Sequence, residues 1–319
     1  MKKVLVLGGT GFVGRHVCEK LTRAGWHVTV PTRRAGNARQ VLHLPGLTVL
    51  EGDVHDEAVL RRLLPGHDAV VNLVAILHGN AAAFDRTHVE LPAKLARACL
   101  ATGVTRLVHI SALGAEPAAA ESAPSLYLRS KSRGEAALQA AAADGLQLSV
   151  LRPSVIFGAD DRFLNLFARL QRVFPVMPLA GAGARFQPVW VEDVAQAVVH
   201  CLHDPATLGQ TYELCGPDIV TLRQLVQLAG RCSLGRARPV LSLPPALGRL
   251  QARLMELAPG EPLMSRDNLD SMRIDNVASG QVPGLHALGI TPAALGAIVP
   301  GYLGGTDRHV TLRERLRRR

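Results

Sequence analysis

The stretch Gly8-Gly9-Thr10-Gly11-Phe12-Val13-Gly14 stands between a short apolar run, 3–7, and a segment with helical spacing, 14–24. A strand, a glycine-rich turn and a helix in this order are typical of a dinucleotide-binding unit. We expect Gly8 to permit a tight turn, Gly11 to let the backbone approach a pyrophosphate, and Gly14 to let the helix pack close to the sheet. The helix N-terminus offers unpaired N–H groups to the phosphates. The residues predicted to bind there are Gly8, Thr10, Gly11, Phe12, Val13 and Gly14.

Strand-like and helix-like segments alternate without a break through the first half of the chain. Each crossover is long enough for a right-handed βαβ unit. The pattern predicts an α/β fold with a doubly wound parallel sheet, the NAD(P)-binding Rossmann fold. The expected strands are 3–7, 27–30, 48–51, 69–74, 107–110 and 148–151, and the expected helices are 14–24, 57–64, 88–102 and 127–144.

Past Arg152 the pattern loosens and prolines become frequent. We expect a Rossmann domain over 1–152, to which later segments return, a smaller C-terminal α/β lobe over 153–305 that closes over the carboxyl ends of the strands, and a basic tail over 306–319. Asp160-Asp161 is expected to cap the first helix of the lobe. The helices expected in this half are 163–173, 191–202, 222–229 and 245–257.

Composition and cysteine usage narrow the class of protein. Of 319 residues, 48% are hydrophobic and only 4% aromatic, which favours an aliphatic core around a parallel sheet. The five cysteines form no CxxC pair and the twelve histidines show no HxH or HxxxH spacing, so neither a disulfide framework nor a metal site is expected. No secretory leader or membrane-spanning run is expected, and the cytoplasm is the default compartment.

The end of the second expected strand bears on the choice of cofactor. It reads Val-Pro-Thr-Arg33-Arg34, where NAD binding normally places a carboxylate. An arginine fork matches a 2′-phosphate, so NADP(H) is favoured over NAD(H). The alternative is that one arginine is solvated and the site does not distinguish the two cofactors. Four residues at the ends of the third and fourth strands are predicted to line the adenine and the ribose: Asp53, Val54, Val74 and Ala75.

Several motifs together resemble a known superfamily. Ser111 follows the fifth strand, Tyr127 and Lys131 are four residues apart, and Arg152-Pro153 ends the sixth strand. With the glycine turn, these motifs are similar to extended or atypical short-chain dehydrogenases/reductases, a resemblance that implies a cofactor contact for Pro153. Other stretches resemble the epimerase/dehydratase-like branch (152–158, 189–195, 212–217) and bacterial relatives of the NADPH-binding accessory subunit of respiratory complex I (263–272, 275–276, 288–290, 300–303).

The spacing of Tyr127 and Lys131 has a chemical rationale. Residues four apart share one helix face, and an ammonium beside a phenol lowers the pKa of the phenol toward the working pH. Tyr127 then gives or takes a substrate proton, Lys131 also reaches the nicotinamide ribose, and Ser111 holds the substrate oxygen. These catalytic residues predict an NADP(H)-dependent oxidoreductase.

The resemblance leaves the activity open. The complex I subunit is generally regarded as binding NADPH without turning over a substrate, so a non-catalytic NADPH-binding subunit or assembly factor is the rival function. A sugar-nucleotide epimerase or dehydratase is a third, disfavoured by the second lobe. The family context implies a quinone or another lipophilic, lipid-like carbonyl compound as substrate, and contact with a respiratory complex. The oligomeric state and the partner subunit are left open.

The net charge and one amphipathic segment indicate which partners the protein could bind. The net charge is +10, and arginines crowd into 308–319, where they suit an anionic membrane, RNA, an acidic partner or a solvated end. Nucleic-acid binding is disfavoured because no aromatic platform lies beside this tail. The segment 245–257 suits either a peripheral location at the inner face of the cell membrane or packing on the nucleotide domain. Its apolar face consists of Leu247, Leu250, Leu254 and Leu257.

Overall fold

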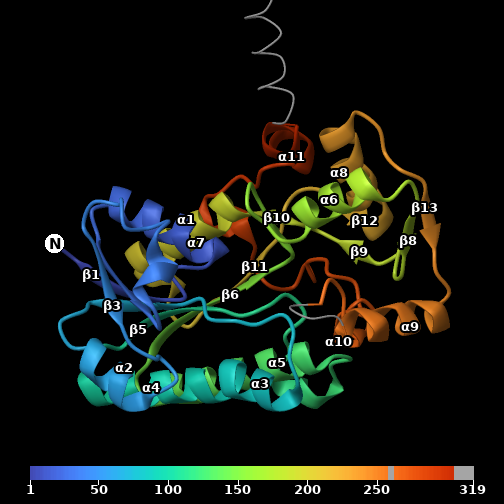
Figure 1. Cartoon of the computed structure of the whole chain (residues 1–319). Coiled ribbons are helices and arrows are strands. Elements are labelled where there is room, and N and C mark those ends of the chain that lie inside the picture. Colours follow the sequence, from blue (N-terminus) through green and yellow to red (C-terminus); the bar gives the residue numbers. More distant parts are fainter. Residues whose placement is uncertain (258–261, 305–319) are drawn as a thin grey trace, which may run out of the picture. The chain divides into compact units, whose positions relative to one another are not determined.

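The computed structural model describes residues 1–257 and 262–304. The chain forms two compact units (Figure 1). Unit 1 comprises Met1–Pro153, Val191–Leu214 and Ala278–Thr291, and unit 2 comprises Ser154–Trp190, Cys215–Val277 and the chain from Pro292 onward. The first segment of unit 1 ends one residue beyond the boundary expected from the sequence. The basic tail expected over 306–319 lies outside the described residues.

Seven parallel strands form the sheet of unit 1, in the order β11-β6-β5-β4-β1-β2-β3. The order reverses between β1 and β4, and in open α/β sheets ligands bind outside the carboxyl ends of the strands at such a switch point. The predicted doubly wound Rossmann sheet is thus confirmed. Its strands are β1 (Lys3–Leu7), β2 (His27–Thr32), β3 (Leu47–Glu51), β4 (Ala69–Asn72), β5 (Arg106–Ile110), β6 (Gln147–Pro153) and β11 (Thr211–Leu214).

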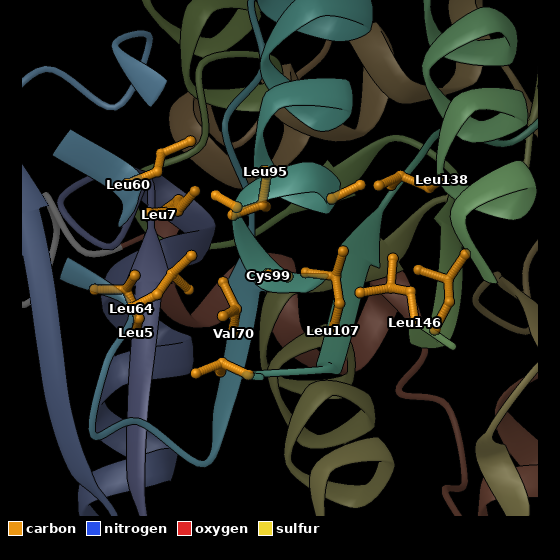
Figure 2. Close-up of a cluster of buried hydrophobic side chains, with 14 of the residues drawn as sticks. Leu5, Leu7, Leu60, Leu64, Val70, Leu95, Cys99, Leu107, Leu138 and Leu146 are labelled. Carbon is orange, nitrogen blue, oxygen red and sulfur yellow. The ribbon is translucent and has the colours of Figure 1, made fainter. Parts of the chain in front are cut away.

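Helices cover both faces of this sheet (Figure 1). On one face, Leu7 of β1, Val70 of β4 and Leu107 of β5 pack with Leu60 and Leu95 of the covering helices, and all five are fully buried (Figure 2). Each such side chain contributes about 1.5–3 kcal/mol by leaving water. The helices on this face are α2 (Glu57–Leu63), α3 (Ala81–Asp85), α4 (Leu91–Thr102) and α5 (Leu126–Ala143), and those on the other are α1 (Phe12–Arg23) and α7 (Val191–His203).

The helix expected over 88–102 is interrupted at its start by a π-helical turn, Arg86–Glu90. Pro92 has no N–H, so the carbonyl of His88 has no donor four residues further on. A Cβ at Gly134 of α5 would stand only 1.7 Å from that carbonyl oxygen. The missing side chain of Gly134 therefore lets α5 approach the π-helical turn closely, which a sequence pattern cannot reveal.

Strand β11 is a further departure, because no strand is predicted there from the sequence. Its four residues are too few to show a period, and Cys-Gly-Pro follows them. It pairs with β6 in a register that joins Thr211 to Val150, and the N–H of Glu213 donates to the Pro283 carbonyl at 2.9 Å. Tertiary pairing at the edge of the sheet, rather than local propensity, makes this segment a strand.

Unit 2 is built from short paired strands and from helices around a core that includes Phe157, Phe167 and Phe186. The helices expected near 163–173, 222–229 and 245–257 are confirmed as α6, α8 and α9. Within residues 1–257 and 262–304, no helix has the length and apolar character needed to cross a membrane. The strand pairs are β7 (Ile156–Phe157) with β10 (Val189–Trp190), β8 (Met177–Leu179) with β13 (Val240–Ser242), and β9 (Arg185–Phe186) with β12 (Val220–Thr221), and the helices are α6 (Leu164–Val173), α8 (Leu222–Leu234), α9 (Pro245–Glu256), α10 (Arg266–Ser271) and α11 (Leu295–Leu303).

The carboxylate of Asp161 organises the start of α6. Its Oδ1 accepts the N–H groups of Phe163 at 2.8 Å and Leu164 at 2.6 Å. Its Oδ2 accepts the hydroxyl of Tyr302 at 3.0 Å. The expected capping role of this carboxylate pair is therefore confirmed for Asp161.

Candidate functional site

The glycine-rich turn between β1 and α1 depends on the absence of side chains. Gly8 has a φ of +81°, in the left-handed region that favours glycine. The N–H of Gly11 donates to the Gly8 carbonyl at 3.0 Å and closes the turn. A Cβ at Gly14 would stand 2.1 Å from that same carbonyl oxygen, so no larger residue fits there.

The glycine that packs closely against the sheet is Gly9 rather than Gly14. A Cβ at Gly9 would come within 2.8 Å of Val30 in β2. The nearest atoms to a Cβ at Gly14 are those of the turn itself, because Gly14 lies in the first turn of α1 above Gly8. The sequence interpretation gave Gly14 this contact and assigned no role to Gly9.

The start of α1 suits a pyrophosphate. Gly11 is the N-cap residue, it makes no side-chain capping bond, and the first turn contains no acidic residue. The N–H groups of Phe12 and Val13 precede the first possible carbonyl partner, and the helix dipole places positive charge there. A Cβ at Gly11 would meet only the Gly8 oxygen, at 3.3 Å, so the backbone is open on this side. The turn therefore fits a dinucleotide, and a bound nicotinamide would supply hydride-transfer chemistry.

Positive charge gathers where β2 ends. Arg33 and Arg34 follow β2 directly and are exposed. A carboxylate does lie nearby, on β3 rather than on β2, since Glu51 accepts the N–H of Ala35 at 2.7 Å. Arg15 of α1 donates to Gln40 at 2.6 Å and adds a third guanidinium to this region. Two exposed guanidiniums therefore follow β2, while the nearby carboxylate is engaged by a backbone N–H.

Asp53 and Val54 follow β3, as the sequence indicates. The Asp53 carboxylate accepts the N–H of His55 at 3.1 Å, and its other oxygen lies 3.7 Å from the guanidinium of Arg86. Burial lowers the pKa of His55, Asp53 opposes this shift, and Arg33 is among the cations that add to it. The electrostatic effect of Arg33 thus reaches the loop that carries Asp53.

Val74 and Ala75 lie just beyond β4, which ends at Asn72. The N–H of Val74 donates to the side-chain oxygen of Asn72 at 3.2 Å, and Ala75 is exposed. A Cβ at Gly8 would come within 3.2 Å of the Val74 nitrogen. The end of β4 therefore lies directly against the glycine turn.

Ser111, Tyr127 and Lys131 meet at the carboxyl end of β5. The N–H of Ser111 donates to Leu151 of β6 at 2.8 Å, and the ammonium of Lys131 donates to the carbonyl of Ile110 at 2.7 Å. Tyr127 packs on a small apolar cluster that contains Ala112, the residue after Ser111. The Pro153 carbonyl accepts the N–H of Leu113 at 3.0 Å, which places Pro153 beside the same loop.

The hydroxyl of Ser111 is a buried polar group whose hydrogen-bonding capacity no described residue uses. Its Oγ is buried, and within the described part of the chain it has no hydrogen-bond partner. A buried hydroxyl without a partner costs about 1–3 kcal/mol. Such a group at the end of a central strand is suited to a ligand oxygen.

Burial dominates the protonation of the other two residues. It raises the pKa of Tyr127 to about 12 and lowers the pKa of Lys131 to about 8, and Glu135 opposes the shift of Lys131. The sequence interpretation expected Lys131 to lower the pKa of Tyr127. The opposite direction is found, because desolvation of the buried phenol is the cause of its shift.

His88 is a part of this site that sequence reasoning missed. Its Nε2 accepts the N–H of Ile76 at 3.1 Å, so Nδ1 carries the proton of the neutral ring and donates to Ser130 Oγ at 2.9 Å. Ser130 in turn donates to the Tyr127 carbonyl at 2.8 Å, and the His88 ring meets the Tyr127 ring edge-on. Burial lowers the pKa of His88 to about 2, so the ring stays neutral.

A buried ion pair lies close to Lys131 and includes Glu135 of the same helix. Glu135, one turn further along α5, is fully buried, and its Oε2 accepts the Nε–H of Arg152 in β6 at 3.0 Å. Its spacing of four from Lys131 and eight from Tyr127 is the signal that could have identified it. In the described part of the chain, no cluster of three or more His, Cys, Asp or Glu side chains could hold a metal ion.

The family model for the NAD dependent epimerase/dehydratase family matches residues 4–215, which span the glycine turn and the strands that carry the three site residues. The chain belongs to this family. The resemblance drawn from the motifs is thereby confirmed, and so is an NAD(P)-binding fold.

Individual relatives refine this placement. NADH dehydrogenase [ubiquinone] 1 alpha subcomplex subunit 9 from mouse mitochondria is 33% identical over 91% of this chain and 76% of its own length. Ceramide reductase of Caulobacter vibrioides is 30% identical over 63% of this chain and 61% of its own length. The dTDP-glucose 4,6-dehydratase DesIV of Streptomyces venezuelae, with NAD bound, superposes with a TM-score of 0.74 over 94% of this chain and 95% of that chain, at 22% identity.

Proposed function

We propose that this protein is an NADP(H)-dependent oxidoreductase that reduces a lipophilic carbonyl or quinone-like substrate. The observation that carries the proposal is the buried Oγ of Ser111, which has no partner in the described part of the chain and lies beside Lys131 at the end of β5. An oxygen of a bound substrate would satisfy this hydroxyl. The similarity to a ceramide reductase supports a lipid-like substrate.

In that reaction, the glycine turn and the three site residues each have a different role. The turn from Gly8 to Gly14 binds the pyrophosphate, and Lys131 holds the ribose. Ser111 orients the substrate oxygen, and Tyr127 exchanges a proton with it. Because burial raises the pKa of Tyr127 to about 12, the phenol is fully protonated at neutral pH and acts in the direction of reduction as an acid.

Loss of the Tyr127 hydroxyl tests this assignment. Tyr127→Phe should lower kcat by roughly 10²–10⁴-fold, because general acid catalysis contributes about that much. NADPH affinity should not change. The measurement is NADPH oxidation with short-chain quinones and with long-chain ketones, beside nucleotide titration followed by fluorescence.

A second function is supported by a different observation. The Lys131 ammonium donates to the Ile110 carbonyl, so the backbone holds it as a group that can bind a ribose without taking part in a reaction. The mouse relative is named as a subunit of NADH dehydrogenase. A non-catalytic NADPH-binding subunit of a respiratory complex would show stoichiometric NADPH without oxidation, in the wild type and in Tyr127→Phe alike.

The preference for NADP(H) has its own test. Replacing Arg33 and Arg34 with Ala should weaken NADPH binding by about 2–3 kcal/mol, since charge-assisted bonds to a 2′-phosphate would be lost. NADH binding should stay within twofold of the wild type. Arg62→Ala, another exposed arginine, is the matched control. An equal loss for NADH would refute the assignment.

A further inference from the structure

Helix α9 of unit 2 turns its apolar face outward. Leu247, Leu250, Leu254 and Leu257 expose 52–76% of their surface. At 3.6 residues per turn they form one continuous stripe. Within the described residues of unit 2, these four leucines therefore do not belong to the buried core.

The inner face of the same helix is made of small residues. Gly248 and Ala252 are buried, and a Cβ at Gly248 would come within 2.7 Å of Ala180. These positions lie roughly opposite the leucine stripe on the helix. The buried positions of α9 are thus small residues rather than leucines.

Further apolar residues of unit 2 are exposed on β13 and just before β8, and α9 contacts β8 through one hydrogen bond. Leu241 lies on β13, which pairs with β8, and it is 59% exposed. Val176 immediately precedes β8, and the Gln251 side chain of α9 donates to the Pro178 carbonyl of β8 at 3.4 Å. Phe174, two residues before Val176, is half exposed. The leucine stripe, Leu241, Phe174 and Val176 together form what we call the apolar rim of unit 2.

Arginines accompany the leucine stripe on the exposed side. Arg253 of α9 is exposed. In the ion pairs Arg249–Asp270 and Arg266–Glu256 the guanidiniums are 51% and 58% exposed, whereas the carboxylates are only about one quarter exposed. The cations therefore face water while the carboxylates lie beneath them. An apolar stripe flanked by outward guanidiniums is complementary to an anionic interface.

We propose that the apolar rim docks on the surface of an anionic lipid bilayer, with α9 lying in the plane of the headgroups. The leucines enter the acyl boundary, and the guanidiniums of Arg249 and Arg253 reach lipid phosphates. The proposal gives a lipophilic substrate a source beside the protein, but it rests on this surface alone and stands whether or not the chain is catalytic.

Vesicle flotation with the full chain tests this docking. Vesicles of phosphatidylcholine with about one third phosphatidylglycerol supply the anionic surface. The double variant Leu250→Gln/Leu254→Gln should lose at least about tenfold of the vesicle-bound fraction. Flotation is repeated in about 0.5 M salt, where attraction by the arginine-rich terminus is screened and the apolar contribution persists.

The control is Leu42→Gln/Ile219→Gln, which alters two residues that are 60% and 47% exposed on other segments and should leave flotation unchanged. Wild-type chain that fails to float, or a Leu250/Leu254 variant that floats like the wild type, would overturn the proposal. So would light scattering that shows a wild-type dimer converted to a monomer by the variant without any flotation, because a second copy would then cover the rim. Nucleotide titration of the same variant separates this outcome from failure of the proposed function.

Discussion

Helices usually bury apolar side chains and expose polar ones. Helix α5 of unit 1 departs from this by burying polar side chains, and α9 of unit 2 departs from it by exposing apolar ones. Helix α5 buries Ser130, Lys131 and Glu135, whereas α9 buries only Gly248 and Ala252 and exposes its leucines. A buried polar group costs free energy unless it is bonded, and an exposed leucine forgoes about 1.5–3 kcal/mol of burial. Neither arrangement is explained by the stability of its own unit.

The difference between the helices indicates what each reversed face is for. Along α5 the buried polar residues have partners on neighbouring strands, since Lys131 bonds to the Ile110 carbonyl of β5 and Glu135 pairs with Arg152 of β6. Such a network fixes side-chain positions, as a reaction site requires. Along α9 the leucines are exposed, and no described element of unit 2 buries them, which favours a partner for this face.

Breaking the polar network of α5 should have the largest effect on stability. Arg152→Ala leaves the fully buried Glu135 without its guanidinium, and removing one partner of a buried pair costs about 3–5 kcal/mol. The free energy of unfolding in urea is the measurement.

The matched change on the other helix is Leu250→Gln, which should alter the free energy of unfolding by at most about 0.5 kcal/mol because the residue already exposes 52% of its surface. Arg97→Ala, which breaks an exposed ion pair with Glu57, should cost about 1 kcal/mol or less. A large loss for Leu250→Gln would show that the leucine stripe is part of the core after all.

The sequence sufficed for features that depend on local pattern. The turn from Gly8 to Gly14, the apolar strands and the Tyr127–Lys131 spacing all have a short-range signature, and the fold followed from them. The pairing of Glu135 with Arg152 joins a helix to a strand, and the bond between His88 and Ser130 joins a π-helical turn to α5. These contacts depend on tertiary packing, as does the burial that raises the pKa of Tyr127.

The buried lysine of α5 should also give the protein a characteristic dependence on pH. Burial lowers the pKa of Lys131 from 10.5 to about 8, so between these values the unfolded chain binds more protons than the folded chain. Stability linked to Lys131 therefore rises with pH across this window, by on the order of 2 kcal/mol, and is lowest below about pH 8. The measurement is the difference in unfolding free energy between wild type and Lys131→Met at pH 8, 9 and 10. A constant difference for Lys131→Met would mean that its ammonium is not held in a desolvated site.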